Sequence, residues 1–542
     1  MTGCDDDDDT PPVEEVPQPQ QGSDGPADQG PPFDHATGDA TRGRDVFRFE
    51  TFGNEGFWTD AMRLPQGVVA AGLTPKQALE AGMSVDVEML DEATRQAVAA
   101  ELAAQGTNGP LLNDPATTLM LINANAVLGV VVKDTNRDGT LDVMNGDKVG
   151  LTCASCHSIT DGSVLNLPDG GGIGRRVDGP TPHNLNVGGI LALAANSRAY
   201  YPLLQVKLTA NGDKSIGRAP SDQGLTKNST EAEVDAYLNN PDFYPRGSFD
   251  DGADGNGAPQ HITPMFRTDL SAPWGTDGSF ARIDNFNNTV YTALLDPTSL
   301  VTPDGRNFIK RLGGAAAGDE LIDDYLKILR ETQVRGPGGV VGEGFPYTEA
   351  STTAEPAGSE AALVGRRVDN QKLLDMNAYT NSLPAPEASG YDDAAASRGR
   401  ELFRRNCTTC HNVDQSRPVP SFVVPMTRIF PGYNPTILAQ RPVEPPFRPM
   451  ALAPIQDDPA SIYDDKTVVV DASQRMDLRG SVMPLLLDLA RKPNFLHDSS
   501  VPTFDALLNP SRGANAPHAV YLEDEGERAD VAEFLKSLDT TP

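Results

Sequence analysis

The chain has 542 residues, of which 38% are hydrophobic, so it is long enough to form several domains with apolar cores. Its 44 basic and 76 acidic residues give a net charge of −32, which repels nucleic acid phosphates and anionic lipid surfaces. We therefore exclude nucleic acid as a partner and expect any charged protein partner to be basic.

Residues 1–41 are acidic and rich in Pro, Gln and Gly, which is typical of a disordered tether. Met1-Thr2-Gly3-Cys4 resembles the end of a bacterial lipoprotein signal, although the leucine and the hydrophobic stretch of that signal are missing. We expect a lipid on Cys4, and the alternative is an unmodified cysteine in an unstructured tail. No apolar run reaches the length of a transmembrane helix, so membrane association is expected only through this lipid.

Three pairs of segments recur in the same order and indicate an internal duplication. They are residues 42–48 with 398–404, residues 293–297 with 506–510, and residues 378–383 with 533–538. The first pair is predicted to begin amphipathic helices and the last pair to end closing helices. The repeats predict two units at residues 42–383 and 398–542. Residues 384–397 form the predicted linker, because Pro384-Ala385-Pro386 favours an extended chain.

The first unit carries the insertions. Thr74-Pro75 predicts a helix N-cap followed by proline at the first helical position, and residues 91–105 predict another helix. Residues 127–133 and 140–144 are predicted to be the two strands of a hairpin. Residues 209–260 are rich in Gly, Asp and Pro and are predicted to form long surface loops.

The turn of the predicted hairpin is similar to a calcium loop. Oxygen-bearing side chains occupy positions 1, 3, 5, 7 and 9, with glycine at position 6: Asp134, Asn136, Asp138, Thr140, Asp142 and Gly139. Position 12 is Asn145 instead of glutamate, with Asp147 as a candidate replacement. The alternatives are a calcium site and a polar turn without a metal, because Asp-Gly is a strong turn pair by itself.

Four of the five cysteines belong to two copies of the CxxCH pattern, which are Cys153, Cys156 and His157, and Cys407, Cys410 and His411. Positions i, i+3 and i+4 share one face of a helical turn, so both thiols can reach the vinyl groups of a haem while the histidine binds its iron. The pattern predicts two covalently bound haem c groups. A zinc site made from both CxxC pairs and a thioredoxin-like redox pair are the alternatives, but neither explains the histidine.

Covalent haem c is attached outside the bacterial cytoplasm. We therefore expect the chain to be exported to the periplasm or the cell surface.

With two haem motifs, two similar halves and the sequence of residues 495–503, FLHDSSVPT, the chain resembles the bacterial dihaem cytochrome c peroxidase superfamily. That superfamily includes methylamine-pathway dihaem enzymes and dihaem rubber oxygenases. Residues 49–58 are also similar to the opening of large members of the group. The resemblance covers most of residues 42–540. It implies a mainly α fold of two tandem cytochrome c-like domains, the first enlarged by loops and a small β-hairpin.

The resemblance also implies that one haem relays electrons while the other has an open or exchangeable sixth position. Candidate sixth ligands of the second haem are Met426, Met450, Met476, Met483, His497 and His518. Those of the first haem are His183, His261 and Met265. The counterpart of His497 in the first unit is Thr276, which is not a ligand, so we expect the first haem to be the reactive one.

Peroxide cleavage needs a group that moves a proton near the iron, and Glu50 and Glu55 are the candidates. The alternative is that both are capping or surface carboxylates. Trp58 and Trp274 are candidates for an electron relay between the haems, and core packing is the alternative.

These features together predict an exported dihaem c-type cytochrome that accepts electrons from a small basic cytochrome or a copper protein. Hydrogen peroxide, reduced at the first haem with electrons relayed by the second, is the expected substrate. Two alternatives remain: an electron-transfer protein with two six-coordinate haems, and a dihaem oxygenase that acts on an organic substrate.

Overall fold

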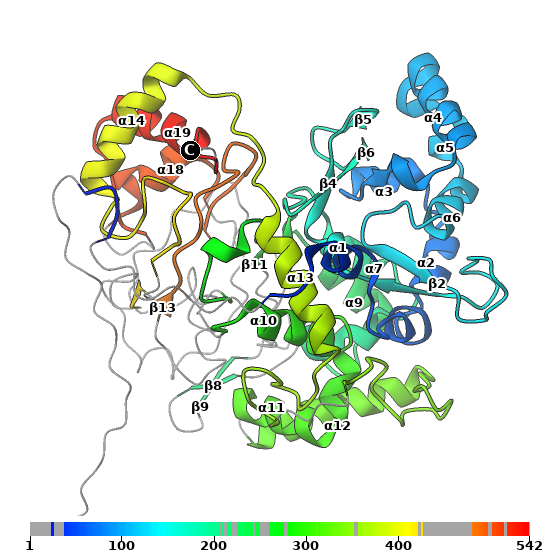
Figure 1. The fold of residues 1–542 in the computed structure, drawn as a ribbon. Helices are drawn as coiled ribbons and strands as arrows, with labels where there is room; N and C mark the ends of the chain where they lie inside the picture. Colours follow the sequence, from blue (N-terminus) through cyan, green and yellow to red (C-terminus); the bar gives the residue numbers. More distant parts are fainter. Residues whose placement is uncertain are drawn as a thin grey trace, which may run out of the picture.

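The structure is a computed structural model, and it describes residues 23–26, 37–204, 208–210, 214–217, 225–241, 244–249, 260–275, 280–313, 315–351, 356–420, 424–425, 480–496, 501–513 and 518–540. The described chain is mainly helical, with small sheets of two or three short strands (Figure 1). This confirms the predicted mainly α class with small hairpins. No helix in these ranges is long and apolar enough to cross a membrane.

Helix α1 (Ala40–Phe49) packs against α13 (Asn370–Ser382), which lies far away in the sequence (Figure 1). Arg42 of α1 donates two hydrogen bonds to the carboxylate of Asp375, at 2.7 and 2.9 Å. A Cβ on Gly43 would lie 1.9 Å from the carbonyl oxygen of Asp375, so only glycine lets the two backbones approach this closely.

The second half of the chain repeats this arrangement with α14 (Asp393–Asn406) and α19 (Glu525–Lys536). Arg398 donates to Asp530 at 2.8 and 2.6 Å, and a Cβ on Gly399 would lie 2.0 Å from the carbonyl oxygen of Asp530. The duplication seen in the sequence therefore extends to the contacts between these helix pairs.

A second repeated feature is a short loop closed by a backbone bridge. Trp274 bridges to Phe280, and Phe495 bridges to Val501 with the same spacing. A helix follows each loop, and then a 3₁₀ turn capped by Asp296 in the first half and Asn509 in the second. These elements are α10 (Ile283–Thr289) and η8 (Pro297–Val301), and α18 (Phe504–Leu508) and η10 (Pro510–Arg512). Figure 1 shows α14, α18 and α19 gathered on one side, away from the insertions of the first half.

The insertions supply most of the other helices. They are α2 (Leu64–Ala71), α3 (Pro75–Glu80), α4 (Glu92–Gln105), α5 (Pro110–Asn113), α6 (Pro115–Asn123), α7 (Val187–Ala192), α8 (Tyr201–Leu204), α9 (Glu231–Leu238), α11 (Pro303–Gly313) and α12 (Ala315–Glu331). The other helical elements of the described ranges are short. They are the π-helices η1 (Phe57–Ala61) and η7 (Val290–Leu294) and the 3₁₀ turns η2 (Val87–Met89), η3 (Gly106–Asn108), η4 (Cys153–Ser155), η5 (Ser197–Tyr200) and η6 (Thr268–Leu270).

The strands are short. Parallel β1 (Val85–Asp86) and antiparallel β5 (Leu165–Asn166) flank β6 (Gly172–Gly174). The other sheets are antiparallel pairs: β2 (Val130–Lys133) with β3 (Lys148–Leu151), β4 (Ser158–Thr160) with β7 (Arg176–Asp178), β8 (Leu208–Ala210) with β9 (Lys214–Gly217), β10 (Ser248–Phe249) with β11 (Gln260–His261), and β12 (Val424–Pro425) with β13 (Gly480–Ser481).

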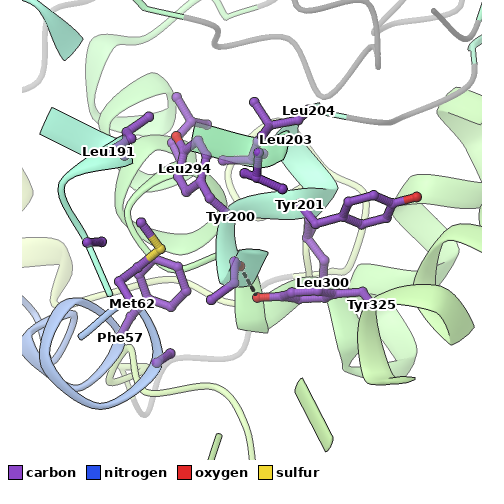
Figure 2. Packing of buried hydrophobic residues seen from close by; sticks show 14 of the residues in the cluster. Phe57, Met62, Leu191, Tyr200, Tyr201, Leu203, Leu204, Leu294, Leu300 and Tyr325 are labelled. Carbon is purple, nitrogen blue, oxygen red and sulfur yellow. Dashed lines mark hydrogen bonds between the residues drawn. The ribbon is translucent and has the colours of Figure 1, made fainter. Parts of the chain in front are cut away.

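The largest apolar cluster lies in the first half (Figure 2). Tyr200, Tyr201 and Tyr325 are almost completely buried in it, and the hydroxyl of Tyr325 donates to the carbonyl of Ala199 at 2.8 Å. A separate, smaller cluster lies among α14, α18 and α19. Each half therefore has its own apolar core.

Two predicted helices of the insertion are confirmed. Thr74 caps α3 through a capping box with Gln77, and Pro75 is the first helical residue. Asp91 caps α4 by accepting a hydrogen bond from the backbone N–H of Thr94 at 2.8 Å. The side chain at each N-cap satisfies a backbone donor that has no partner within the helix.

The hairpin prediction is right for its first strand and wrong for its second. Strand β2 pairs with β3, which starts at Lys148, whereas residues 140–144 form bends and turns. The buried carboxylate of Asp147 explains this, because it accepts hydrogen bonds from the backbone N–H groups of Thr135 and Asp142, each at 2.9 Å. Those donors are therefore held within the loop.

The prediction of long loops at residues 209–260 is wrong in part. Helix α9 lies within this range, capped by Thr230 and Glu233, and it buries Val234, Tyr237 and Leu238. The capping-box pattern Thr-x-x-Glu was visible in the sequence and marks the start of this helix.

The structure shifts the predicted end of the tether and the predicted end of the linker by a few residues. Asp39, within the predicted tether, already caps α1, and Gly25 and Pro26 are buried. The carbonyl of Asp24 accepts a hydrogen bond from the backbone N–H of Val413 at 2.8 Å. At the joint, α13 ends before Pro384 as expected, but α14 begins at Asp393, so the extended connection ends within the predicted linker.

Candidate haem sites

The first CxxCH motif forms a single tight turn directly after β3. The backbone N–H groups of Cys156 and His157 both donate to the carbonyl of Cys153, at 3.3 and 3.0 Å. These hydrogen bonds join residues three and four apart, which is the local geometry that the spacing of the motif predicts.

The second motif forms the same turn at the end of α14. Cys407 ends the helix by donating its N–H to Phe403, and the N–H groups of Cys410 and His411 donate to the carbonyl of Cys407 at 3.2 and 3.1 Å. None of these four motif cysteines is in a disulfide. The local geometry predicted for haem attachment is therefore present twice.

Cys153 is buried, and the other three motif cysteines are partly buried. Burial raises the pKa of Cys153 to about 11 and the pKa values of Cys156 and Cys407 to about 12, so these thiols are protonated at neutral pH. Within the part of the chain that the structure describes, no three His, Cys, Asp or Glu side chains gather as they would around a metal ion. The zinc alternative requires both CxxC pairs at one point and does not match this arrangement.

The clearest candidate centre is at the second motif, where the rings of His411 and His518 lie with centroids 6.3 Å apart at an interplanar angle of 48°. Two imidazoles bound to opposite faces of one iron, each through a bond of about 2 Å, have centroids roughly 6 Å apart. The Nδ1 atom of His518 is buried without a hydrogen-bond partner. These rings therefore fit an iron placed between them.

Both rings are neutral at pH 7. Burial is the main cause that lowers the pKa of His411 to about 3 and that of His518 to about 4, and the proximity of His518 adds to the effect on His411. Neutral imidazole is the form that binds metals. His518 has φ of +54°, an uncommon conformation for a residue other than glycine, so the surrounding chain holds it in this position.

Apart from His518, the structure describes one of the candidate ligands of the second motif, which is Met483. Met483 is partly exposed and does not belong to the apolar cluster among α14, α18 and α19. His497, Met426, Met450 and Met476 lie outside the described residues, as do Cys4 and Thr276.

The first motif packs against the α1–α13 helix pair. The Sγ atom of Cys153 lies 3.4 Å from the hydroxyl of Tyr291 and 3.6 Å from Sδ of Met376. Tyr291 also donates to the carbonyl of Glu50 at 3.2 Å and stacks edge-on against Phe52. Sequence reasoning missed Tyr291 and Met376, because no local pattern links either residue to a cysteine so distant in the chain.

The surroundings of His157 differ from those of His411. Burial lowers the pKa of His157 to about 4, opposed by a hydrogen bond to the backbone of Thr263. In the described ranges no second ring stacks near His157 as His518 does near His411. Among its predicted sixth ligands, Met265 belongs to the same apolar cluster as Cys153, while His183 and His261 lie together at the boundary with the second half.

Both candidate acids are engaged in local structure. The carboxylate of Glu50 accepts hydrogen bonds from the N–H groups of Thr51 and Phe52, at 3.1 and 2.9 Å, and pairs with Lys372. These contacts lower the pKa of Glu50, although its burial alone would raise it. Glu55 accepts from the hydroxyl of Thr51 at 2.6 Å. Their part in proton transfer stays a prediction.

The two tryptophans occupy different places. Trp58 is 2% exposed and packs in the large apolar core beside Phe57 and Tyr200. Trp274 packs against the cluster that contains Cys153. Both relay candidates therefore lie near the first motif, because Cys156 packs against the core that contains Trp58.

The candidate calcium residues lie in the loop between β2 and β3. The carboxylate of Asp134 accepts from the N–H groups of Asp138 and Gly139, and that of Asp138 accepts from Thr140. Asp142 accepts from the N–H of Met144. Backbone N–H groups therefore already donate hydrogen bonds to several of the carboxylate oxygens that would ligate calcium. Calcium binding at this loop stays a prediction.

No protein-family model matches the chain, and no curated protein matches it. Among solved structures, the hydrazine synthase of Kuenenia stuttgartiensis pressurized with 20 bar xenon matches with 12% identity and a TM-score of 0.23. The match covers 63% of this chain and 92% of that one. So low a TM-score supports no conclusion about the fold or the function of this chain.

Proposed function

We propose that this chain is a dihaem c-type cytochrome of the peroxidase type. The observation that carries the proposal is the facing pair His411 and His518, whose rings are spaced as two ligands of one iron would be. In this proposal Cys407 and Cys410 hold the second haem and the two histidines ligate it from both sides. Such an iron has no vacant position, which suits electron relay.

The first haem is assigned to Cys153, Cys156 and His157. No second ring faces His157 among the described residues, which supports an open or weakly ligated iron at this site. An open haem iron binds small oxygen species. Hydrogen peroxide would take two electrons and two protons to give two water molecules, with the electrons supplied by a reduced partner protein through the second haem.

The proposed architecture is two cytochrome c-like domains. It is supported by the repeated helix pairs, each with a glycine at the crossing and an Arg–Asp pair beside it, and by the repeated bridged loops. In the first of these domains a long insertion separates α1 from its motif, whereas in the second domain the motif directly follows α14.

The test begins with the chain produced in a bacterium that attaches haem c. The pyridine haemochrome spectrum should give two covalent haems per chain, and replacing Cys407 and Cys410 by alanine should leave one. Electron paramagnetic resonance of the half-reduced protein should then show one low-spin and one exchangeable high-spin haem. A chain without covalent haem would refute the proposal.

Activity separates this proposal from its alternatives. Peroxide should oxidise a reduced basic cytochrome or copper protein only when the chain is present. Two stable low-spin haems without this activity would restrict the function to electron transfer, and oxygen uptake with added organic compounds would indicate an oxygenase.

Location is part of the same proposal. We propose export to the periplasm or cell surface with a lipid on Cys4, which the haem chemistry and the first four residues support. Mass spectrometry of the native amino terminus should find the lipid, and an unmodified Cys4 would remove the anchor from the proposal.

A further inference from the structure

The aromatic ring that contacts the first haem motif has a counterpart in the second half. Tyr291 lies two residues before the repeated segment 293–297, and Phe504 lies two residues before the matching segment 506–510. Each ring is buried in the apolar cluster that includes or adjoins the first cysteine of the motif in its own half. At this position the two halves therefore differ by one hydroxyl group.

The hydroxyl of Tyr291 has two acceptors within reach. Its oxygen lies 3.4 Å from Sγ of Cys153 and 3.2 Å from the carbonyl oxygen of Glu50. The second distance is long for a hydrogen bond from a hydroxyl to an oxygen, which usually spans about 2.5–3.0 Å. Because sulfur is larger than oxygen, 3.4 Å is an ordinary length for a hydrogen bond to Sγ. The carbonyl of Glu50 therefore leaves the hydroxyl available to the sulfur.

The surrounding structure holds the ring of Tyr291 in one place. The side chain is completely buried, and Phe52 packs edge-on against it with the ring centroids 4.5 Å apart. The hydroxyl of Thr348 lies 3.2 Å from the carbonyl oxygen of Tyr291 and 2.9 Å from the buried carboxylate of Asp296. That carboxylate also accepts from the backbone N–H of Thr348 at 2.6 Å. These contacts fix the position of the Tyr291 hydroxyl beside Cys153.

Haem attachment would make this hydroxyl the donor in the contact with Cys153. In the free cysteine either the thiol or the hydroxyl can donate. Attachment turns Cys153 into a thioether, whose sulfur has no hydrogen and can only accept. Burial is the main cause that raises the pKa of Tyr291 well above its ordinary value, so the hydroxyl keeps its proton at neutral pH. Met376 lies 3.6 Å from the same sulfur, but its own sulfur has no hydrogen to donate.

We propose that Tyr291 is a positioning residue that acts on the first haem through Cys153: its hydroxyl donates a hydrogen bond to the thioether sulfur and raises the reduction potential of that haem. This inference rests on the proposed function. A hydrogen-bond donor at the haem edge places positive charge where electron density increases on reduction, so it favours the reduced state. Phe504 has no hydroxyl, so this position supplies no such donor in the second half. The hydroxyl thus makes the two haem sites unequal.

The test compares the midpoint potentials of both haems in the holoprotein and in three variants, Tyr291→Phe, Tyr325→Phe and Met376→Leu, by spectroelectrochemical titration at one pH. Tyr291→Phe removes only the hydroxyl and leaves the ring that the second half carries at this position, so it should fold. Tyr325→Phe is the matched control, because Tyr325 is equally buried and donates to the carbonyl of Ala199 at 2.8 Å. Met376→Leu changes the packing against Sγ of Cys153 without removing a donor. Haem content and circular dichroism are recorded for every variant.

We expect Tyr291→Phe to lower the equilibrium constant for reduction of the first haem about threefold, a shift of about 28 mV for one electron. The potential of the second haem, and both potentials in Tyr325→Phe and Met376→Leu, should stay at the wild-type values. No shift in Tyr291→Phe, or an equal shift in either control, would overturn the inference. A higher potential in Tyr291→Phe would also overturn it, because the hydroxyl would then face the sulfur with its oxygen lone pairs.

Haem content separates a failure of this inference from a failure of the proposed function. The protein in which Cys407 and Cys410 are replaced by alanine should keep only the first haem, and it identifies the signal of that haem in the titration. A wild type without covalent haem refutes the proposed function and the inference together. Two covalent haems with an unchanged potential in Tyr291→Phe refute the inference alone.

Discussion

Replacing His518 by glycine tests the assignment of the second haem most directly. Its φ of +54° is accessible to glycine without strain, so His518→Gly removes the imidazole and relieves a backbone strain of about 1 kcal/mol. The 6.3 Å spacing from His411 makes His518 the second axial ligand in our proposal. One of the two irons should therefore lose a strong ligand, and half of the ferric haem should gain high-spin character.

Visible and electron paramagnetic resonance spectra of the oxidised protein measure this change. Imidazole added to His518→Gly should enter the vacated space and restore the low-spin signal. Met483→Leu is the matched control, because Met483 is the competing ligand within the described residues, and its spectrum should match the wild type. An unchanged low-spin signal in His518→Gly, or its loss in Met483→Leu, would refute the assignment.

Three further predictions concern the fold and the loop. Gly399→Ala should lower the free energy of unfolding by about 2–3 kcal/mol, because its Cβ would lie 2.0 Å from a backbone oxygen. Gly338→Ala is the control: no atom lies within 4 Å of its Cβ, so the free energy of unfolding should change by only a few tenths of a kcal/mol. Urea unfolding measures both variants, and equal effects would contradict the argument that Gly399 is needed where the helices cross. The hydrogen bond from Arg42 lowers the pKa of Asp375 to about 2, so Asp375→Asn should lower the free energy of unfolding by about 1 kcal/mol at pH 7. This difference between wild type and variant should fade as the pH falls below about 4 towards 2, where the carboxylate becomes protonated. Unfolding curves at several pH values measure it, and a difference that does not depend on pH would argue against the ion pair. Calorimetric titration with calcium should show binding that Asp138→Ala abolishes, and a wild type that takes up no calcium would leave the loop a polar turn.

Local features of the molecule could be predicted from the sequence alone. The CxxCH turns follow from spacing, because their hydrogen bonds join residues three and four apart. The N-caps at Thr74 and Asp91 are equally local. The repeated Arg-Gly pairs indicated the duplication, and the structure adds the reason for each glycine, which is a backbone oxygen of the partner helix.

Strand boundaries and loops were harder to predict. The second strand of the hairpin depends on Asp147, whose buried carboxylate collects backbone donors from residues on the far side of the loop. The alternation of apolar and polar residues, from which strands are predicted, gives no sign of hydrogen bonds between a carboxylate and the backbone of a loop. The first strand, a run of valines, required no such information.

The sequence by itself determined the two sets of residues that we propose attach haem, since a cofactor bound through one helical turn needs only local spacing. The tertiary structure set His518 apart from Met483 among the candidate ligands in the described residues by placing its ring beside that of His411, and it brought Tyr291 and Met376 to Cys153. The physical reason is the same in both cases. Residues far apart in the chain meet only after the helices and loops between them have packed, and their contact depends on burial and shape across the whole fold.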